Sequence, residues 1–209
     1  IFFALISGLL WFYSTTYKRQ LLVGNIIVAL LVAMVPMLVV VYDAAPIYRY
    51  YSQAATDFPG VAILFWWVGG FALFAFLTTL IREIIKDMED VYGDREMECR
   101  TLPIIWGIKA TKIISIALIS ITMAVLLFIN FVYIDFEGTL TLRYILLGLI
   151  LPFAWVIYLL IKAKQPDEYH RISNLIKFIM LIGLLYAPIF YFLLARETGL
   201  ILFNFFTVS

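Results

Sequence analysis

The sequence predicts an all-α protein built as a polytopic transmembrane helical bundle. Hydrophobic residues make up 65% of the 209 residues and charged residues only 14%, with a mean hydropathy of +1.03, which is typical of integral membrane proteins. A bilayer core about 30 Å thick requires roughly 20 apolar residues per helix. The chain contains five apolar runs of this length, at about residues 20–42, 60–81, 108–133, 141–162 and 174–194.

A shorter apolar run opens the chain. Residues 1–12 are too few to span a bilayer and lack the basic residues that begin a signal peptide. We therefore expect them to be the end of a helix that begins upstream. Residues 1–209 would then form a single transmembrane domain, as a fragment that lacks its first helices.

Proline and glycine residues inside the apolar runs predict local irregularities. Pro36, Pro152 and Pro188 each remove one helical hydrogen bond, so a kink is expected at each position. Gly69 and Gly70 lie within the second run, where small residues allow a neighbouring helix to approach closely. Both features are structural expectations rather than signs of a site.

The connections between the predicted helices differ in charge. Twelve of the fifteen lysine and arginine residues lie in the first, third and fifth connections, and only Arg49, Arg143 and Arg196 lie elsewhere. By the positive-inside rule, the odd-numbered connections are expected in the cytoplasm. The net charge of +1 and the absence of a basic patch interleaved with aromatic residues predict no nucleic-acid partner. Cys99 is the only cysteine, which excludes a cysteine-based metal site.

The third connection is the most informative segment. Residues 82–103 contain seven of the fourteen carboxylates of the chain, and a charged residue at the bilayer centre costs about 3 kcal/mol. The helix that starts near residue 60 is therefore expected to leave the membrane around Arg82 and to continue along its surface to a turn at Pro103. Four of its acids recur at helical spacing and define an acid stripe: Glu83, Asp87, Asp90 and Asp94.

Four acids on one helical face repel one another unless a cation lies over them. Oxygen ligands suit a hard ion, and Mg²⁺ is expected when phosphate oxygens complete its coordination. Basic residues beside the stripe are suited to contact the same phosphate, since arginine binds phosphate oxygens bidentately. They are Arg82, Lys86, Arg95 and Arg100. The alternative is a solvated helix with surface salt bridges, for example between Lys86 and Asp90.

This segment resembles the second aspartate-rich motif of the UbiA superfamily of intramembrane prenyltransferases. The resemblance rests on the spacing of Asp87, Asp90 and Asp94, which is followed by Arg95 and by the RTLP sequence from Arg100. The stretch REIIKDMED, residues 82–90, is most similar to the digeranylgeranylglyceryl phosphate synthase subgroup. An upstream connection and the start of the next helix are also similar to this family: Tyr13, Ser14, Lys18, Arg19, Gly24 and Asn25.

The resemblance implies a fold and an activity. The family has nine transmembrane helices around a central cavity, and this chain would correspond to about helices 4–9, without the first aspartate-rich motif. The implied reaction is Mg²⁺-dependent transfer of a prenyl group from an isoprenoid diphosphate to a lipophilic acceptor, with release of pyrophosphate. The acceptor would be a glycerol-phosphate ether lipid precursor or an aromatic quinone precursor. The implied location is the inner or cytoplasmic membrane, and the fragment alone is expected to be inactive.

The resemblance also implies roles for individual residues. Asp87, Asp90 and Asp94 would be the metal ligands and the catalytic residues. The residues expected to contact the diphosphate and its pocket are Lys86, Arg95, Arg100, Lys18 and Tyr13. Asn25 would either serve this site or bond a neighbouring helix, and His170, the only histidine, is expected to be solvated rather than catalytic.

Three other functions are compatible with a membrane protein that carries an acidic segment. A cation transporter would use the carboxylate cluster as a pathway, but it predicts ionisable residues inside the spans. A CDP-alcohol phosphotransferase requires an Asp-Gly pair and an Ala-Arg pair, and neither precedes Asp87. A purely structural protein does not need an ordered stripe of acids. We therefore expect a prenyltransferase, with the transporter as the main alternative.

Overall fold

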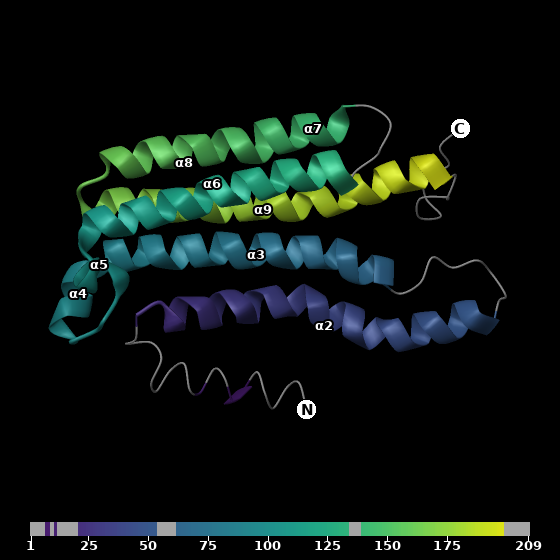
Figure 1. Cartoon of the computed structure of the whole chain (residues 1–209), viewed down its shortest axis with the longest axis horizontal. Coiled ribbons are helices and arrows are strands. Elements are labelled where there is room, and N and C mark those ends of the chain that lie inside the picture. Colours follow the sequence, from purple (N-terminus) through teal and green to yellow (C-terminus); the bar gives the residue numbers. More distant parts are fainter. Residues whose placement is uncertain (1–6, 9–10, 12–20, 54–61, 134–138, 199–209) are drawn as a thin grey trace.

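The structure is a computed structural model that describes residues 7–8, 11, 21–53, 62–133 and 139–198. Within these ranges the chain forms helices and no strand. The long helices run side by side, parallel or antiparallel, as a bundle (Figure 1). Five of them are long and apolar enough to cross a membrane, which confirms the predicted all-α, multi-pass membrane fold.

The helices follow the predicted order but have different limits. The long ones are α2 (Val23–Gln53), α3 (Ala62–Glu89), α6 (Gly107–Tyr133), α8 (Leu151–Lys162) and α9 (Pro166–Thr198). α8 is preceded without a break by α7 (Leu140–Tyr144) and by a π-helical turn, η2 (Ile145–Ile150). Two short helices connect α3 to α6: α4 (Val91–Glu96) and α5 (Leu102–Ile105). α3 continues through Arg82, as predicted.

α9 begins at Pro166, ahead of the apolar run predicted from residue 174. The carboxylate of Glu168 accepts hydrogen bonds from the backbone N–H groups of Lys164, at 2.6 Å, and Gln165, at 2.8 Å. These bonds cap the first turn, and proline is favoured at the first position of a helix. Capping therefore sets the start of α9, which hydropathy alone placed too late.

The proline residues are accommodated within helices. Pro152 lies in the first turn of α8, directly after η2. Because proline has no N–H, the carbonyl four residues earlier loses its helical donor, and a π-helical turn is one way to adjust the hydrogen-bond register. α2 and α9 continue through Pro36 and Pro188, and the kinks expected there remain predictions.

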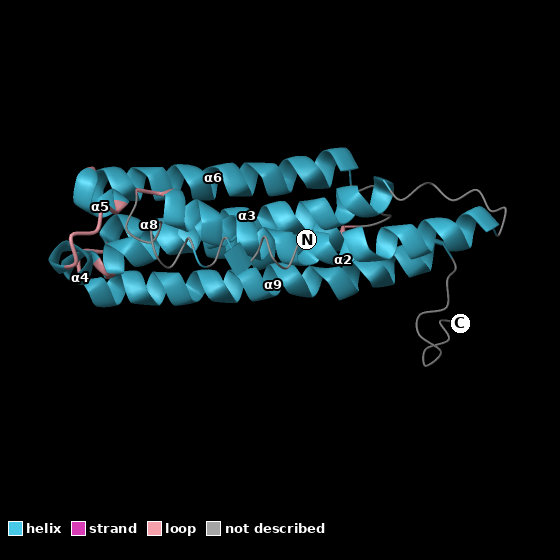
Figure 2. Cartoon of the chain, turned by 90° about the horizontal axis from the view of Figure 1, so that it is seen from below, coloured by secondary structure: helices cyan, strands magenta, loops and turns pink. Residues whose placement is uncertain are grey.

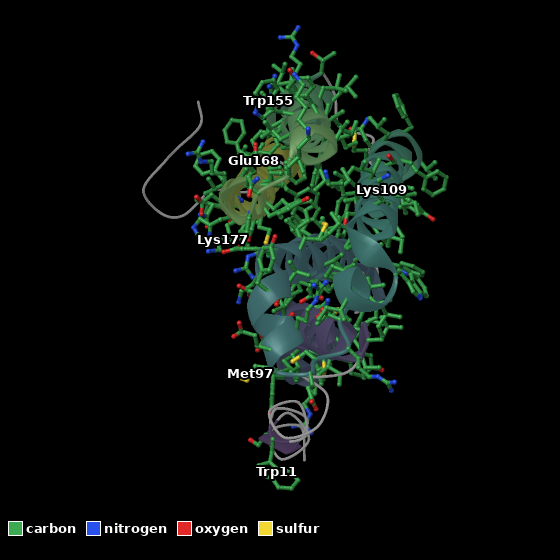
Figure 3. The ribbon with its side chains drawn as sticks, turned by 90° about the vertical axis from the view of Figure 1, so that its left-hand side faces the viewer. Trp11, Met97, Lys109, Trp155, Glu168 and Lys177 are labelled. Carbon is green, nitrogen blue, oxygen red and sulfur yellow. The ribbon has the colours of Figure 1, made fainter. Side chains whose placement is uncertain are left out.

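One end of the bundle gathers the segments around the acid stripe. α2 begins there, α3 ends there, α4 and α5 lie there, and α9 begins there (Figure 1, left). A view from below places α4, α5 and their loops at the same end (Figure 2). We call it the acidic end. Figure 3 looks onto this end, with Met97 beside α4, Lys109 on α6, and Glu168 and Lys177 on α9. The third and fifth connections therefore share one side of the bundle, as their charges predicted.

α3 lies at the centre of the packing. One face contributes Ile81 and Ile85 to a core formed with α6, α8 and α9, whose largest buried side chain is Phe153. Another face packs Leu80 and Ile84 against residues of α2 and α5, namely Ala29 and Leu102. α3 therefore lies between α2 and α9 (Figure 1), and both neighbours position its acidic end.

The close approach of α9 to α3 depends on Gly183. A methyl group at Gly183 would lie 2.1 Å from Cε1 of Phe74, far inside van der Waals contact. At Gly69 and Gly70 a methyl group would meet no atom within 4 Å. The prediction that this pair allows a neighbouring helix to approach was wrong for the described part of the chain, because a side chain at either glycine would meet open space rather than a packed helix.

The surface helix ends before Pro103. The N–H of Cys99 donates to the carbonyl of Asp94 at 2.9 Å, and that of Glu98 donates to Arg95 at 3.3 Å, the pattern of a Schellman turn. Glu98 has a φ of 55°, a left-handed conformation that favours glycine. Pro103 lies instead in the first turn of α5. The predicted turn at Pro103 was therefore misplaced, since the chain turns at Glu98.

Gly183→Ala is expected to destabilise the protein by about 1–3 kcal/mol, because the added methyl overpacks the contact with Phe74. Thermal unfolding in detergent measures the effect. Gly69→Ala is the matched control, and it is expected to leave stability unchanged or to raise it by up to about 1 kcal/mol, because alanine is the better helix former. Phe74→Leu in the Gly183→Ala background should recover part of the loss. Equal stability of the two alanine variants would contradict the described contact.

Glu98→Gly is expected to stabilise the protein by about 1 kcal/mol, because it relieves the left-handed strain of a side-chain-bearing residue. Glu96→Gly is the matched control. It places glycine inside α4 and is expected to destabilise by up to about 1 kcal/mol. Chemical denaturation of both variants measures these effects, and destabilisation by Glu98→Gly would show that α4 ends differently.

Candidate functional site

The acid stripe begins on the last turns of α3 and continues across a bend onto α4. Asp90 lies at the bend, with a φ of −87° and a ψ of 7°. Helical hydrogen bonds continue through it, from the N–H of Asp90 to the carbonyl of Lys86 and from that of Asp94 to Asp90, both at 2.9 Å. The charge of Asp87 interacts with those of its stripe neighbours, which are Asp94, Glu83 and Asp90. The predicted stripe therefore survives the bend.

Asn25 joins this site from α2. Its Nδ2 donates to Oδ2 of Asp87 at 2.7 Å, although the two residues are 62 positions apart. Both side chains are half-buried, and a hydrogen bond to a charged acceptor is among the stronger polar contacts in proteins. Asn25 thus bonds a neighbouring helix, which is one of the two roles considered for it, and its partner is a candidate site residue.

The acids and bases of the segment differ in exposure. Asp87 and Asp94 are half-buried, whereas Asp90 is exposed. The predicted diphosphate contacts are all exposed: Lys86, Arg95 and Arg100. Lys86 forms no ion pair with Asp90 in the described part of the chain. The surface salt bridge expected from the alternative interpretation, a solvated helix, is therefore not formed between these two residues. The three bases are therefore open to a ligand from solvent, whereas two of the acids are partly buried.

Arg82 differs from the other bases of the segment. Its Nη1 donates to Oε1 of Glu83 at 2.5 Å, while its Nε is buried and has no hydrogen-bond partner in the described structure. Arg82 and Glu83, the first acid of the stripe, therefore neutralise each other's charge. The other acids of the stripe are Asp87, Asp90 and Asp94, which are the predicted metal ligands.

The described residues contain no group of three His, Cys, Asp or Glu side chains close enough to hold a metal ion by themselves. The donor chemistry still fits Mg²⁺, which is usually held by one or two carboxylates, with waters and substrate phosphates completing its coordination. Asn25 donates to one carboxylate oxygen of Asp87, Oδ2, and a carboxylate has a second oxygen that can coordinate an ion. The residues therefore fit a Mg²⁺ ion that arrives with a phosphate ligand.

Two predicted site residues, Tyr13 and Lys18, fall outside the described residues. The larger cavities of the described part lie apart from the acid stripe. The largest cavity described, about 550 Å³, lies between η2 and α9 and is lined by residues that include Arg143 and Pro188. A smaller one lies among aromatic side chains such as Phe74 and Tyr186. Neither cavity is lined by a residue of the acid stripe.

One contact at the acidic end was missed by sequence reasoning. His170 is 57% exposed, as expected of a solvated residue, but its Nδ1 lies 2.7 Å from Oε1 of Glu89, the last residue of α3. Its Nε2 lies 2.9 Å from the amide nitrogen of Asn174. Glu89 and His170 are 81 positions apart, and no local sequence pattern predicts a contact between residues so distant.

The chain is similar in sequence to a family of membrane prenyltransferases. The sequence pattern of the UbiA prenyltransferase family matches residues 1–182. A digeranylgeranylglyceryl phosphate synthase from Thermococcus sibiricus is 29% identical over 91% of this chain. Synthases of the same name from Methanopyrus kandleri and Methanosphaera stadtmanae are 31% and 38% identical over 87% and 54% of the chain.

The chain is shorter than these relatives. It spans 58% of the Thermococcus sibiricus and Methanopyrus kandleri proteins and 42% of the Methanosphaera stadtmanae protein. No solved structure gives a significant match. The sequence similarity therefore shows the family of the chain.

Asn25→Ala is expected to destabilise the intact protein by about 1–3 kcal/mol, because it leaves the half-buried Asp87 carboxylate without its donor. The same change in an Asp87→Asn background should cost much less. Chemical denaturation of the two single variants and the double variant gives the coupling energy, and strictly additive effects would show that the contact contributes nothing.

Proposed function

We propose, because this chain belongs to the UbiA prenyltransferase family, that the whole protein transfers a prenyl group from an isoprenoid diphosphate to a lipophilic acceptor and releases pyrophosphate. The relatives named digeranylgeranylglyceryl phosphate synthase favour an acceptor of the glycerol-phosphate lipid class. An aromatic quinone precursor is the alternative acceptor. This chain, which spans about half of those relatives, would contribute one of two metal-binding motifs.

The observation that carries this proposal is the contact between Asn25 and Asp87. It joins two segments that each resemble the family and that are 62 positions apart in the sequence. The contact holds one carboxylate of the acid stripe at the end of an apolar bundle. A site at that position suits an amphiphilic donor, whose diphosphate needs water and cations while its isoprenoid tail needs the bilayer.

The proposed reaction requires charge neutralisation at the leaving group. The bond between C1 of the prenyl chain and the diphosphate oxygen breaks, and pyrophosphate keeps the electron pair. With a glycerol-phosphate lipid, the hydroxyl oxygen of the acceptor then bonds C1 and releases its proton to solvent. With an aromatic acceptor, a ring carbon bonds C1 and the ring loses the proton. Mg²⁺, when bound, supplies positive charge against the departing pyrophosphate.

The residues of this chain have separate roles in the proposal. Asp87, Asp90 and Asp94 would supply the metal ligands, one or two carboxylates at a time with phosphate oxygens completing the coordination, and Asn25 orients Asp87. Three exposed bases contact phosphate oxygens: Lys86, Arg95 and Arg100. Arginine is suited to this role because its planar guanidinium donates two parallel hydrogen bonds to phosphate. By resemblance alone, Lys18 and Tyr13 lie beside the diphosphate and the pocket entrance.

We further propose that the acidic end faces the cytoplasm. Twelve of the fifteen lysine and arginine residues lie in the odd-numbered connections, and the positive-inside rule assigns such connections to the cytoplasmic side. The diphosphate headgroup would then be bound from the cytoplasm by a protein of the inner or cytoplasmic membrane.

Asp87→Asn and Asp90→Asn are each expected to lower Mg²⁺-dependent pyrophosphate release by at least about 100-fold, since each removes charge that holds the metal. The assay uses the full-length protein with geranylgeranyl diphosphate and either a prenylated glycerol phosphate or a hydroxybenzoate as acceptor. Product analysis identifies which acceptor is alkylated.

Glu96→Gln is the matched control, because Glu96 is an exposed acid on α4 outside the acid stripe. It should leave turnover nearly unchanged. Undiminished turnover of Asp87→Asn and Asp90→Asn would contradict the site assignment. Uptake of divalent cations into vesicles without any prenylated product would support the transporter alternative instead.

A further inference from the structure

A chain of hydrogen bonds connects α9 to the last residue of α3. Lys177 Nζ lies 3.1 Å from Oδ1 of Asn174, the amide nitrogen of Asn174 lies 2.9 Å from Nε2 of His170, and Nδ1 of His170 lies 2.7 Å from Oε1 of Glu89. The three α9 residues recur at steps of four and three, so they share one face of the helix. They form a continuous polar contact between two helices of the bundle.

The chemistry of the end members sets the direction of every bond. The ammonium group of Lys177 only donates, so Asn174 accepts with its oxygen and donates with its amide nitrogen. Nε2 of His170 must then accept, which places the ring proton on Nδ1. That proton is donated to the carboxylate of Glu89. Each group is therefore paired, and the imidazole ring has one defined orientation.

The carboxylate that accepts this hydrogen bond belongs to Glu89, at the point where α3 ends and the chain bends toward α4. Glu89 is the last residue of α3, and the bend at Asp90 follows directly. Side chains two positions apart on a helix point to nearly opposite sides, so Glu89 faces α9 while Asp87 faces α2. The final turn of α3 is thus held from α2 by Asn25 and from α9 by His170.

We propose that His170 is a positioning residue for the acid stripe. Its bond to Glu89 fixes the end of α3 and with it the angle at which α4 presents Asp94 toward Asp87. This inference rests on the proposed function, because it concerns the same acids. Direct hydrogen-bond partners of metal ligands typically contribute a factor of 10–100 to metal affinity. Because His170 acts through Glu89, its effect is expected at the lower end of this range.

Two substitutions at His170 test the contributions of its two ring nitrogens separately. Asparagine places its amide nitrogen near the position of Nδ1 and retains a donor to Glu89, whereas glutamine places its amide group near Nε2 and loses that donor. Mn²⁺ binding to the full-length protein, in the presence of inorganic pyrophosphate, is measured by electron paramagnetic resonance. His170→Gln should weaken binding about tenfold, and His170→Asn should leave it within about twofold of the parent.

Kinetics provide a second, independent measurement. His170→Gln should raise the Mg²⁺ concentration needed for half-maximal pyrophosphate release by about tenfold, with most of kcat recovered at saturating Mg²⁺. His170→Asn should restore the parent's Mg²⁺ dependence. A role limited to folding would lower the amount of active protein without shifting this dependence.

Lys112→Met is the matched structural control. Lys112 on α6 donates to the carbonyl of Ile161, at 3.4 Å, and to that of Ala163 at the end of α8. Its ammonium also lies 5.7 Å from the centre of the Tyr169 ring, and among the described residues no hydrogen bond or ion pair joins it to α3. This variant should lower thermal stability and leave Mn²⁺ affinity unchanged. Equal Mn²⁺ affinity of the glutamine, asparagine and parent proteins would overturn the positioning role, as would a loss of affinity in Lys112→Met that matches its loss of stability.

The outcomes distinguish this inference from the proposed function. A parent protein that binds Mn²⁺ but forms no prenylated product from any donor contradicts the function, while the difference between the glutamine and asparagine variants still decides the role of His170. A productive parent whose two His170 variants bind Mn²⁺ equally well contradicts the positioning role alone.

Discussion

The cost of placing ionised side chains in hydrocarbon governs this structure. α3 is apolar through Ile81 and then carries acids and bases to its last residue, so its charged part must lie at an end of the bundle rather than within it. Because the helix does not break at Arg82, its acids keep helical spacing and remain on one face. The short helix α4 and the capped start of α9, which gather around them, are polar for the same reason.

A row of like charges also has to be held in place. Apolar packing of Leu80 and Ile84 against Ala29 and Leu102 fixes the position of α3 just before the charged turns. Polar contacts then fix the turns themselves, from α2 through Asn25 and from α9 through His170. The arrangement leaves carboxylate oxygens and exposed bases at the end of an apolar bundle, which is where the head of an isoprenoid diphosphate meets water.

Features that depend on local composition could be predicted from the sequence, and those that depend on distant pairing could not. Hydropathy placed the five spans, and charge placed the third and fifth connections at one end. The start of α9 was predicted too late because its first turns are polar and hydropathy does not detect them. The helix begins there because the carboxylate of Glu168 caps it. Gly183, not Gly69 or Gly70, mediates close helix contact, because contact depends on which face meets a neighbour. The bond from His170 to Glu89 had no sequence signal, since 81 positions separate the pair.

The central claim is that the aspartates at the end of α3 and on α4 bind a divalent ion together with a diphosphate. The most direct measurement is anomalous scattering from crystals of the full-length protein grown with Mn²⁺ and a non-hydrolysable isoprenoid thiolodiphosphate. The account predicts an anomalous peak about 2.1 Å from carboxylate oxygens of Asp87 and of Asp90 or Asp94, with the diphosphate completing the coordination. A bound diphosphate with no metal near these carboxylates, or with Asp87 and Asp94 turned toward bulk water, would contradict it.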